Sequence, residues 1–181
     1  MTMIRLYLLI SIITLSSYAS QGQMLLRDFG DYVQIGLPLT GLGLSLVKKD
    51  KAGTYQLLKS FALQTGSTIL LKRAINRKRP NGGKYSFPSG HTSLSFMGST
   101  FLWKRYGWKY GVPATIAATF VGYSRASIDD PVHHPSDVFA GAAIGVLSSL
   151  LFTKVRESGN RIDLIGDTTY VGVNLKFNLA K

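Results

Sequence analysis

The chain has 181 residues, which suits one domain with a hydrophobic core, and it contains no cysteine, so disulfides and cysteine-ligated metals are excluded. Its formal net charge of +12 favours anionic partners: phosphate groups, anionic lipid headgroups or nucleic acid. Apolar residues make up 45% and the mean hydropathy is +0.13, and these values leave both a soluble and a membrane protein open.

The N-terminus has the layout of a secretory signal peptide. Arg5 precedes a short apolar run over residues 6–15, and the small residues Ser17 and Ala19 follow where a signal peptidase cleaves. The run is shorter than the roughly 20 residues that a spanning helix needs. We expect residues 1–19 to be a signal peptide or, alternatively, an uncleaved first membrane helix. In either case the chain is exported.

Five further apolar stretches follow, and none of them shows the strict alternation of a half-buried strand. They cover residues 32–47, 54–71, 92–103, 111–123 and 138–152. Their lengths favour helices. We therefore predict an all-α fold: a bundle of five helices, or six if the signal segment is retained, with the main domain at residues 20–158.

The charged residues indicate how the bundle is oriented. Basic clusters at residues 48–51, 104–109 and 154–161 would share one end of an up-and-down bundle, and the loops 74–90 and 125–136 would share the other. The clusters match the positive-inside tendency of membrane proteins, so we expect the bundle to be embedded in a membrane. The two loops are basic as well, and a soluble bundle would bring them together in the same way.

The C-terminal tail follows a different period. Apolar residues alternate with polar or small ones from Val171 to Leu179, which is typical of a β-strand. Residues 161–165 and a turn at Gly166 and Asp167 could complete a hairpin. We expect residues 159–181 to form a strand-like tail outside the helical domain.

All three histidines fall in the two loops that the bundle brings together. Arginine and lysine in the same loops can bind phosphate oxygens, and a helix N-terminus preceded by serine and glycine can donate N–H groups to an anion. The candidate residues are Lys72, Arg79, Ser89, Gly90 and His91 around the first loop and Arg125, His133 and Asp137 around the second. Together they predict a phosphate site.

The spacing of His133 and Asp137 suggests a nucleophile and its orienting carboxylate. If Pro135 opens a helix, Asp137 lies in its first turn and could accept from one ring nitrogen of His133, which leaves the other free to attack phosphorus. His91 could protonate the leaving oxygen. Three cations could neutralise the phosphoryl charge without a metal or other cofactor: Lys72, Arg79 and Arg125.

These residues resemble the three motifs of the phosphatidic-acid-phosphatase type 2 (PAP2) superfamily. Residues 72–80 fit Lys, six residues, Arg-Pro; residues 88–91 are the Pro-Ser-Gly-His motif; and residues 124–137 resemble Ser-Arg, five residues, His, three residues, Asp. The resemblance covers roughly residues 30–153. It implies that His133 becomes phosphorylated, that Asp137 orients it and that His91 is the acid. The phosphate ligands that it implies are Lys72, Arg79, Ser89, Gly90 and Arg125.

The third motif departs from the family in its spacing. Seven residues, 126–132, separate Arg125 from His133 where the family has five. Asp129 and Asp130 belong to the longer segment and are typical turn residues before a proline. The segment either bulges outward or moves Arg125 away from the phosphate.

The resemblance implies a metal-independent phosphatase that hydrolyses a lipid phosphate monoester or polyprenyl diphosphate through a phosphohistidine. We expect it in the bacterial inner membrane with the site facing the periplasm. A soluble periplasmic acid phosphatase and an inactive protein that binds anionic lipid stay open as alternatives. A nucleic-acid partner is not expected, because no basic platform with interleaved aromatic residues is visible. A metal site at His133, His134 and Asp137 would lack further ligands.

Overall fold

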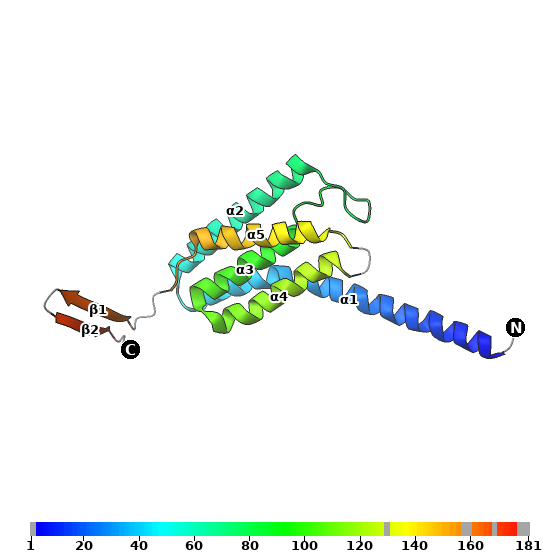
Figure 1. Cartoon of the computed structure of the whole chain (residues 1–181), viewed down its shortest axis with the longest axis horizontal. Coiled ribbons are helices and arrows are strands. Elements are labelled where there is room, and N and C mark those ends of the chain that lie inside the picture. Colours follow the sequence, from blue (N-terminus) through cyan, green and yellow to red (C-terminus); the bar gives the residue numbers. More distant parts are fainter. Residues whose placement is uncertain (1–2, 129–130, 157–160, 168–169, 177–181) are drawn as a thin grey trace.

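The computed structural model describes residues 3–128, 131–156, 161–167 and 170–176. Within them the chain forms five helices and one hairpin: α1 (Met3–Val47), α2 (Lys51–Ile75), α3 (Gly90–Tyr106), α4 (Trp108–Ala126), α5 (Pro135–Phe152), β1 (Arg161–Asp167) and β2 (Tyr170–Lys176). Figure 1 shows the helices side by side as a bundle, with the hairpin beyond it. The predicted helical bundle is confirmed.

Helix α1 is much longer than the predicted helix over residues 32–47. It continues from Met3 through the candidate signal segment, and its 45 residues make it about 68 Å long. Figure 1 shows its N-terminal part projecting past the bundle. The helices therefore number five because the candidate signal and the first predicted helix are one element. Cleavage near Ala19 stays a prediction, as does the division of the chain after residues 19 and 158.

Local capping residues and a proline explain where α2, α3 and α5 begin. The Asp50 side chain accepts from the Gly53 N–H at 3.0 Å and starts α2, while Ser89 caps α3 by accepting from the Thr92 N–H. Pro135 is the first residue of α5, a position where proline's missing N–H costs nothing. These boundaries place the loops 76–89 and 127–134 at one end of the bundle, as the charge pattern predicts.

Helix α3 is the centre of the bundle and contacts all four other helices. Met97, Phe101 and Leu102 are fully or almost fully buried along it. Small residues let its neighbours approach closely: Gly98 lies against the backbone of α1 at Pro38, and Gly141 of α5 lies against the Ser89 carbonyl. The start of α3, which carries Ser89 to His91, is therefore held by direct backbone contact.

We expect Gly141→Ala to destabilise the protein and to displace the Ser89 loop. A Cβ at this position would overlap the carbonyl oxygen of Ser89, which cannot rotate away as a side chain could. Overpacking of this kind costs about 1–3 kcal/mol. The unfolding temperature and the rate of phosphate release should both be lower than in Gly66→Ala. This variant is a matched control, because an added Cβ at Gly66 meets no atom within 4 Å. Equal unfolding temperatures for the two variants would contradict the packing assignment.

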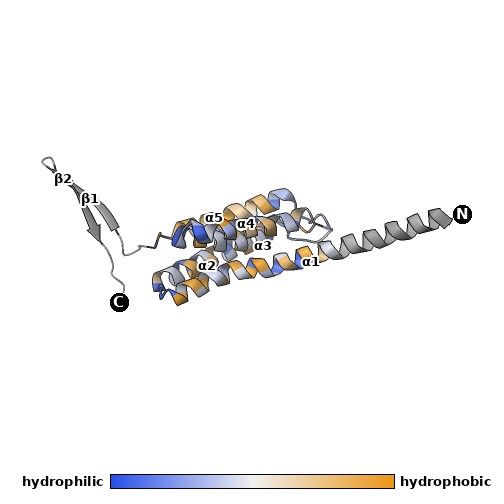
Figure 2. Cartoon of the chain, turned by 90° about the horizontal axis from the view of Figure 1, so that it is seen from below, coloured by the Kyte–Doolittle hydropathy of each residue, from blue (hydrophilic) through white to orange (hydrophobic). Residues whose placement is uncertain are grey.

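The outer surfaces of the helices are strongly apolar. Exposed side chains include Leu70, Ile116, Phe139 and Leu147, and Phe139 leaves 76% of its surface uncovered. Figure 2 shows hydrophobic residues along the helices and hydrophilic ones at their ends. Among the described residues one helix, α5, is long and apolar enough to cross a membrane, with a mean hydropathy of 1.5 over 18 residues.

The C-terminal hairpin agrees with the predicted strand pattern. Strands β1 and β2 are antiparallel, with Arg161 opposite Lys176 and Asp167 opposite Tyr170. The predicted second strand extended to Leu179, and residues 177–181 lie outside the described part of the chain.

Candidate active site

The two predicted loops meet at one end of the bundle, where one backbone hydrogen bond joins them and another closes the second loop. The Ser89 N–H donates to the Asp137 carbonyl at 2.9 Å, and the His133 N–H donates to the Arg125 carbonyl at 3.1 Å. The first bond connects the start of α3 to the start of α5, and the second closes the loop between α4 and α5. Residues from distant parts of the sequence are thereby fixed around one site.

His133 is buried beside Asp137, with 1% of its side chain exposed. Its Nδ1 atom lies 3.8 Å from Asp137 Oδ2, which is within ion-pair range but longer than a hydrogen bond. The direct hydrogen bond that the spacing suggests is therefore not formed. The carboxylate oxygen concerned already accepts from the His134 N–H at 3.0 Å and from Ser86 Oγ.

Ser86 is a site residue that sequence reasoning missed. Its hydroxyl is fully buried, donates to Asp137 Oδ2 at 2.5 Å and lies 3.5 Å from His133 Nδ1. Ser86 thus stands between the imidazole and the carboxylate. One residue, Phe87, separates it from the Pro-Ser-Gly-His motif, and it occupies none of the motif positions, so the sequence held no signal for it.

Arg77 also reaches the site from outside the motifs. Its guanidinium lies 2.9 Å from Asp137 Oδ1 and donates to Ser136 Oγ at 2.7 Å. With Ser86 and the His134 N–H on the other oxygen, the Asp137 carboxylate is held on both sides. A carboxylate so placed stays ionised and is fixed in orientation.

The charge state of His133 follows from its surroundings. Burial and, after it, the positive charges of Lys72 and Arg79 lower the pKa of His133 to about 4, and the Asp137 carboxylate offsets only part of this. At neutral pH the imidazole is therefore neutral, with a nitrogen lone pair available.

Lys72 and Arg79 supply positive charge next to both catalytic candidates, since their fields act on His91 as well as on His133. Lys72 Nζ donates to the Tyr85 carbonyl at 2.8 Å, and Arg79 Nε donates to the Lys84 carbonyl at 3.0 Å. These bonds anchor the two cations to the first loop. Ammonium and guanidinium groups carry several donors, so both can hold the loop and bind an anion together.

Ser89 and Gly90 are placed differently from each other. The Ser89 side chain is fully buried, caps α3 and accepts from Thr92, and its N–H is used by Asp137. Gly90 begins α3 beside Lys72, whose Cε would lie 3.8 Å from an added Cβ. Gly90 is thus at the N-terminus of α3 next to Lys72, and Ser89 holds this N-terminus in place through its cap and its bond to Asp137.

Asp31 of α1 is a second residue that sequence reasoning missed. One oxygen, Oδ1, lies 3.1 Å from His91 Nε2 and 3.1 Å from an Arg125 terminal nitrogen. The same Arg125 nitrogen donates to the Arg27 carbonyl at 2.9 Å. Arg125 is 2% exposed, and among the described residues its Nε has no hydrogen-bond partner. One terminal nitrogen of Arg125 is therefore engaged with α1, while its buried Nε is unsatisfied within the described part of the chain.

A family model described as the PAP2 superfamily matches residues 53–161, more than half of the chain. The chain is a member of the PAP2 superfamily. The match includes all three motif segments, and the structure shows that these segments converge on the site just described.

Several relatives and solved PAP2 structures resemble the chain. A lipid A 1-phosphatase of Helicobacter pylori is 28% identical over 134 residues, which cover 66% of each protein. A lipid A 1-phosphatase of Porphyromonas gingivalis is 39% identical over 90 residues, 48% of this chain and 20% of that protein. The chain thus spans less than two thirds of either relative.

The crystal structure of Aquifex aeolicus LpxE superposes with a TM-score of 0.60 at 26% identity, covering 77% of this chain and 92% of that one. The first transmembrane PAP2 type phosphatidylglycerolphosphate phosphatase from Bacillus subtilis shares the fold, with a TM-score of 0.58 at 24% identity over 75% of each chain.

The longer third motif of this PAP2 protein is partly folded onto the bundle. Ile128 and Val132 on either side of the insertion are buried, while Asp129 and Asp130 lie outside the described residues. The His133 N–H still bonds the Arg125 carbonyl, so both ends of the segment are anchored. The extra residues accordingly leave His133 in contact with Asp137 and its partners. Among the described residues no cluster of His, Asp or Glu could hold a metal ion.

Proposed function

We propose that this PAP2 protein hydrolyses a phosphate monoester or diphosphate carried by a membrane lipid, through a phosphohistidine formed on His133. The observation that carries the proposal is a buried, neutral imidazole held beside an anchored carboxylate and faced by two cations. The relatives named as lipid A 1-phosphatases, and an Arabidopsis lipid phosphate phosphatase that is 44% identical over 79 residues, support a lipid substrate.

The first chemical step transfers the phosphoryl group. Nε2 of His133 attacks phosphorus, and the bond from phosphorus to the leaving oxygen breaks. His91, whose protonated form would be stabilised by Asp31 and by the bound phosphate anion, gives that oxygen its proton. Lys72, Arg79 and the N–H groups at the start of α3 stabilise the equatorial oxygens, which is the main requirement of phosphoryl transfer. In the second step water attacks the phosphohistidine, passes a proton to His91 and releases phosphate.

We propose Ser86 as a positioning residue for this chemistry. Because its hydroxyl donates to Asp137, its oxygen can accept from Nδ1 of His133, which keeps the lone pair on Nε2. Ser86→Ala should lower kcat roughly 10- to 100-fold, the value of a hydrogen bond to a charged group, and leave KM almost unchanged. A variant with an altered KM and an unchanged kcat would place Ser86 in substrate binding instead.

The lowered pKa of His133 predicts the acid limit of activity. The nucleophile must be neutral to attack. An ordinary histidine would gain a proton near pH 6.5, but kcat/KM should fall on the acid side only as the pH approaches about 4, where His133 gains a proton. Lys72→Met removes a cation that disfavours imidazolium, so the acid limb should move to higher pH. The pH profiles of the wild-type protein and of Lys72→Met are measured with the same substrate, so the ionisation of the substrate affects both profiles equally. An unmoved limb in the variant would contradict the assignment of this limb to His133.

A membrane setting is part of the proposal. The exposed apolar faces of the bundle would meet lipid, and the catalytic end would face the periplasm, opposite the basic clusters at residues 48–51 and 104–109. The phosphorylated headgroup would reach the site from the outer leaflet while its acyl chains stay among the helices.

Phosphate release by detergent-purified full chain tests the proposal. The substrates are lipid A 1-phosphate, polyprenyl diphosphate, phosphatidate, phosphatidylglycerophosphate and a soluble aryl phosphate, each with excess chelator. Chelator-resistant release that favours a lipid supports a metal-independent lipid phosphatase. Turnover of the soluble aryl phosphate that equals or exceeds turnover of every lipid substrate would favour a soluble-ester phosphatase. Lipid binding without phosphate release from any ester would favour an inactive lipid-binding protein.

A further inference from the structure

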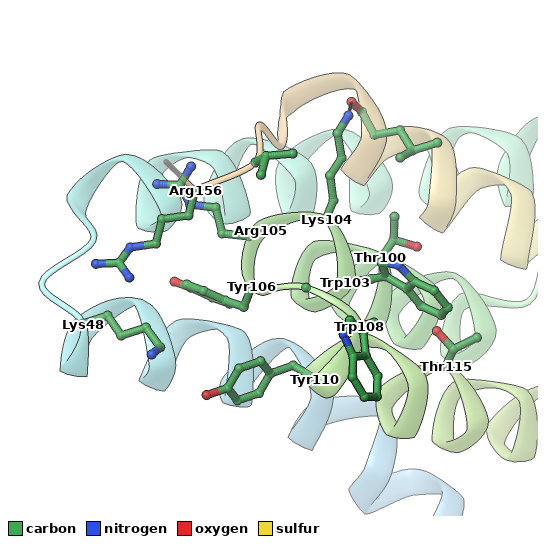
Figure 3. Close-up of a pocket in the computed structure, with 13 residues that line it drawn as sticks. Lys48, Thr100, Trp103, Lys104, Arg105, Tyr106, Trp108, Tyr110, Thr115 and Arg156 are labelled. Atoms are coloured by element: carbon green, nitrogen blue, oxygen red, sulfur yellow. Dashed lines mark hydrogen bonds between the residues drawn. The ribbon is translucent and has the colours of Figure 1, made fainter. Parts of the chain in front are cut away.

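A pocket lies at the end of the bundle opposite the active site. It has a volume of about 770 Å³ and forms where α3 turns into α4, with contributions from the ends of α1 and α5. Figure 3 shows this pocket. Helix α3 runs from the active site to the pocket, and its 17 residues separate the two by about 25 Å. This approaches the roughly 30 Å of a bilayer's hydrocarbon core, so in a membrane the pocket would lie near the opposite surface.

Aromatic side chains form one wall of this pocket, which we call the Trp103–Trp108 pocket. Trp103 and Trp108 stand on either side of the α3–α4 turn, and Tyr106 and Tyr110 continue the wall toward α1. Trp108 leaves 66% of its surface exposed and Trp103 46%. The exposed aromatic rings and the neighbouring Leu150 present apolar surface to the solvent. An acyl chain packed against them would remove this surface from water, which is favourable.

Cations also line the pocket. Lys48 lies over the Tyr110 ring at 5.9 Å, Lys104 donates to the Leu150 carbonyl at 2.9 Å, and Arg156 is exposed at the rim. No carboxylate belongs to the described residues that line the pocket. The cations of the pocket could therefore bind an anion next to its aromatic wall.

Arg105 also lines the pocket, but unlike the other cations it is paired with a carboxylate. Its guanidinium lies within hydrogen-bond distance of both Asp50 oxygens, at 2.7 and 2.5 Å, and donates to the Lys154 carbonyl at 3.0 Å. Tyr106 donates to the same Asp50 carboxylate at 3.1 Å. These bonds tie the α1–α2 turn, the end of α3 and the segment after α5 together, so the floor of the pocket is a built structure.

We propose that the Trp103–Trp108 pocket binds an anionic phospholipid of the membrane leaflet opposite the active site. Lys48, Lys104 and Arg156 would contact the phosphodiester headgroup, and the two tryptophans would cover the first part of an acyl chain. The inference goes beyond the proposed reaction and shares with it only the membrane setting. An amphiphile fits the pocket better than a free anion does. A free phosphate would use only the cations and would leave the aromatic wall without a contact.

The two tryptophans of the chain both line this pocket, so selectively excited tryptophan fluorescence reports on it alone. Full-length protein would be reconstituted in phosphatidylcholine vesicles that contain a fixed fraction of lipid with brominated acyl chains, either phosphatidylglycerol or phosphatidylcholine. Bromine quenches tryptophan on contact. We expect clearly stronger quenching by the brominated phosphatidylglycerol. Equal quenching by the two lipids would overturn the proposal and leave an ordinary interfacial aromatic belt.

A matched pair of double variants locates the effect. Lys48→Gln/Arg156→Gln should reduce the preference for phosphatidylglycerol about tenfold, because each cation at a membrane surface adds severalfold to anionic lipid affinity. Lys59→Gln/Lys109→Gln removes the same charge from exposed positions outside the pocket and should retain the preference. Equal losses in the two variants would show unspecific attraction and overturn the pocket assignment.

Two further readings separate the remaining outcomes. Glycerol phosphate in solution should not change the fluorescence of detergent-purified protein, and a saturable change would overturn the lipid in favour of a soluble phosphate ligand. Phosphate release is measured on the same vesicles. Normal release with equal quenching would refute the lipid pocket alone, and selective quenching without release would refute the phosphatase proposal alone.

Discussion

His133→Ala is expected to release phosphate from every substrate at least about 10³-fold more slowly than the wild-type protein, because a covalent route cannot proceed without its nucleophile. Alanine removes the only atom that bonds phosphorus in the proposed first step, while Lys72 and Arg79 still bind the ester. The affinity for a non-hydrolysable phosphonate lipid should therefore stay close to the wild-type value. Phosphate release and phosphonate binding, measured on the same preparation, check both statements.

His134→Ala is the matched control for this variant. Its side chain is next in sequence and contacts the Lys78 carbonyl, while the bond to Asp137 comes from its backbone N–H and survives the substitution. We expect nearly wild-type release. If His133→Ala retained most of its activity while His134→Ala lost it, the nucleophile would be assigned to the wrong histidine.

His91→Gln is expected to slow the hydrolysis of a lipid phosphate about 10²- to 10⁴-fold, the usual contribution of a general acid. The loss should be much smaller for the first step with an aryl phosphate, because a phenolate departs without a proton. Rapid-quench kinetics should show an initial burst of phenol from the variant followed by slow turnover, since the second step also needs His91 to accept a proton from water.

Asp31→Asn separates the effect of His91 from that of its partner. Asp31 offsets part of the positive field around His91 and also pairs with Arg125, so its removal should slow lipid phosphate hydrolysis less than His91→Gln does. Equal losses in the rate of the first step with aryl and lipid phosphates in His91→Gln would argue that His91 binds the phosphate and gives no proton to the leaving group.

The fold was predictable because its signals are local. Apolar stretches ending in basic clusters mark four of the helices, and Asp50, Ser89 and Pro135 are recognisable helix starts. The length of α1 was not predictable in this way, because the polar residues before residue 32 suggest a loop. In the structure the helix continues through them, and Asp31 finds its partners on α3 and α4.

The convergence of the motif residues on one end of the bundle was also predictable, and their supporting contacts were not. Ser86 and Arg77 reach Asp137 across 51 and 60 residues of sequence, distances at which spacing carries no information. The same contacts explain why the simple His133–Asp137 bond is replaced by a bridged arrangement. Arg125 illustrates a different limit, since its motif position indicates a phosphate ligand and one of its terminal nitrogens is engaged with α1.

The phosphohistidine itself is the most direct test of the proposed mechanism. Full-length protein would be mixed with substrate labelled in the transferred phosphoryl group, quenched in base within the first turnover and digested for mass spectrometry. The proposal predicts a base-stable, acid-labile label on His133, more abundant in His91→Gln with aryl phosphate and absent in His133→Ala. Continued turnover without a label, or a label on another residue, would contradict His133 as the nucleophile.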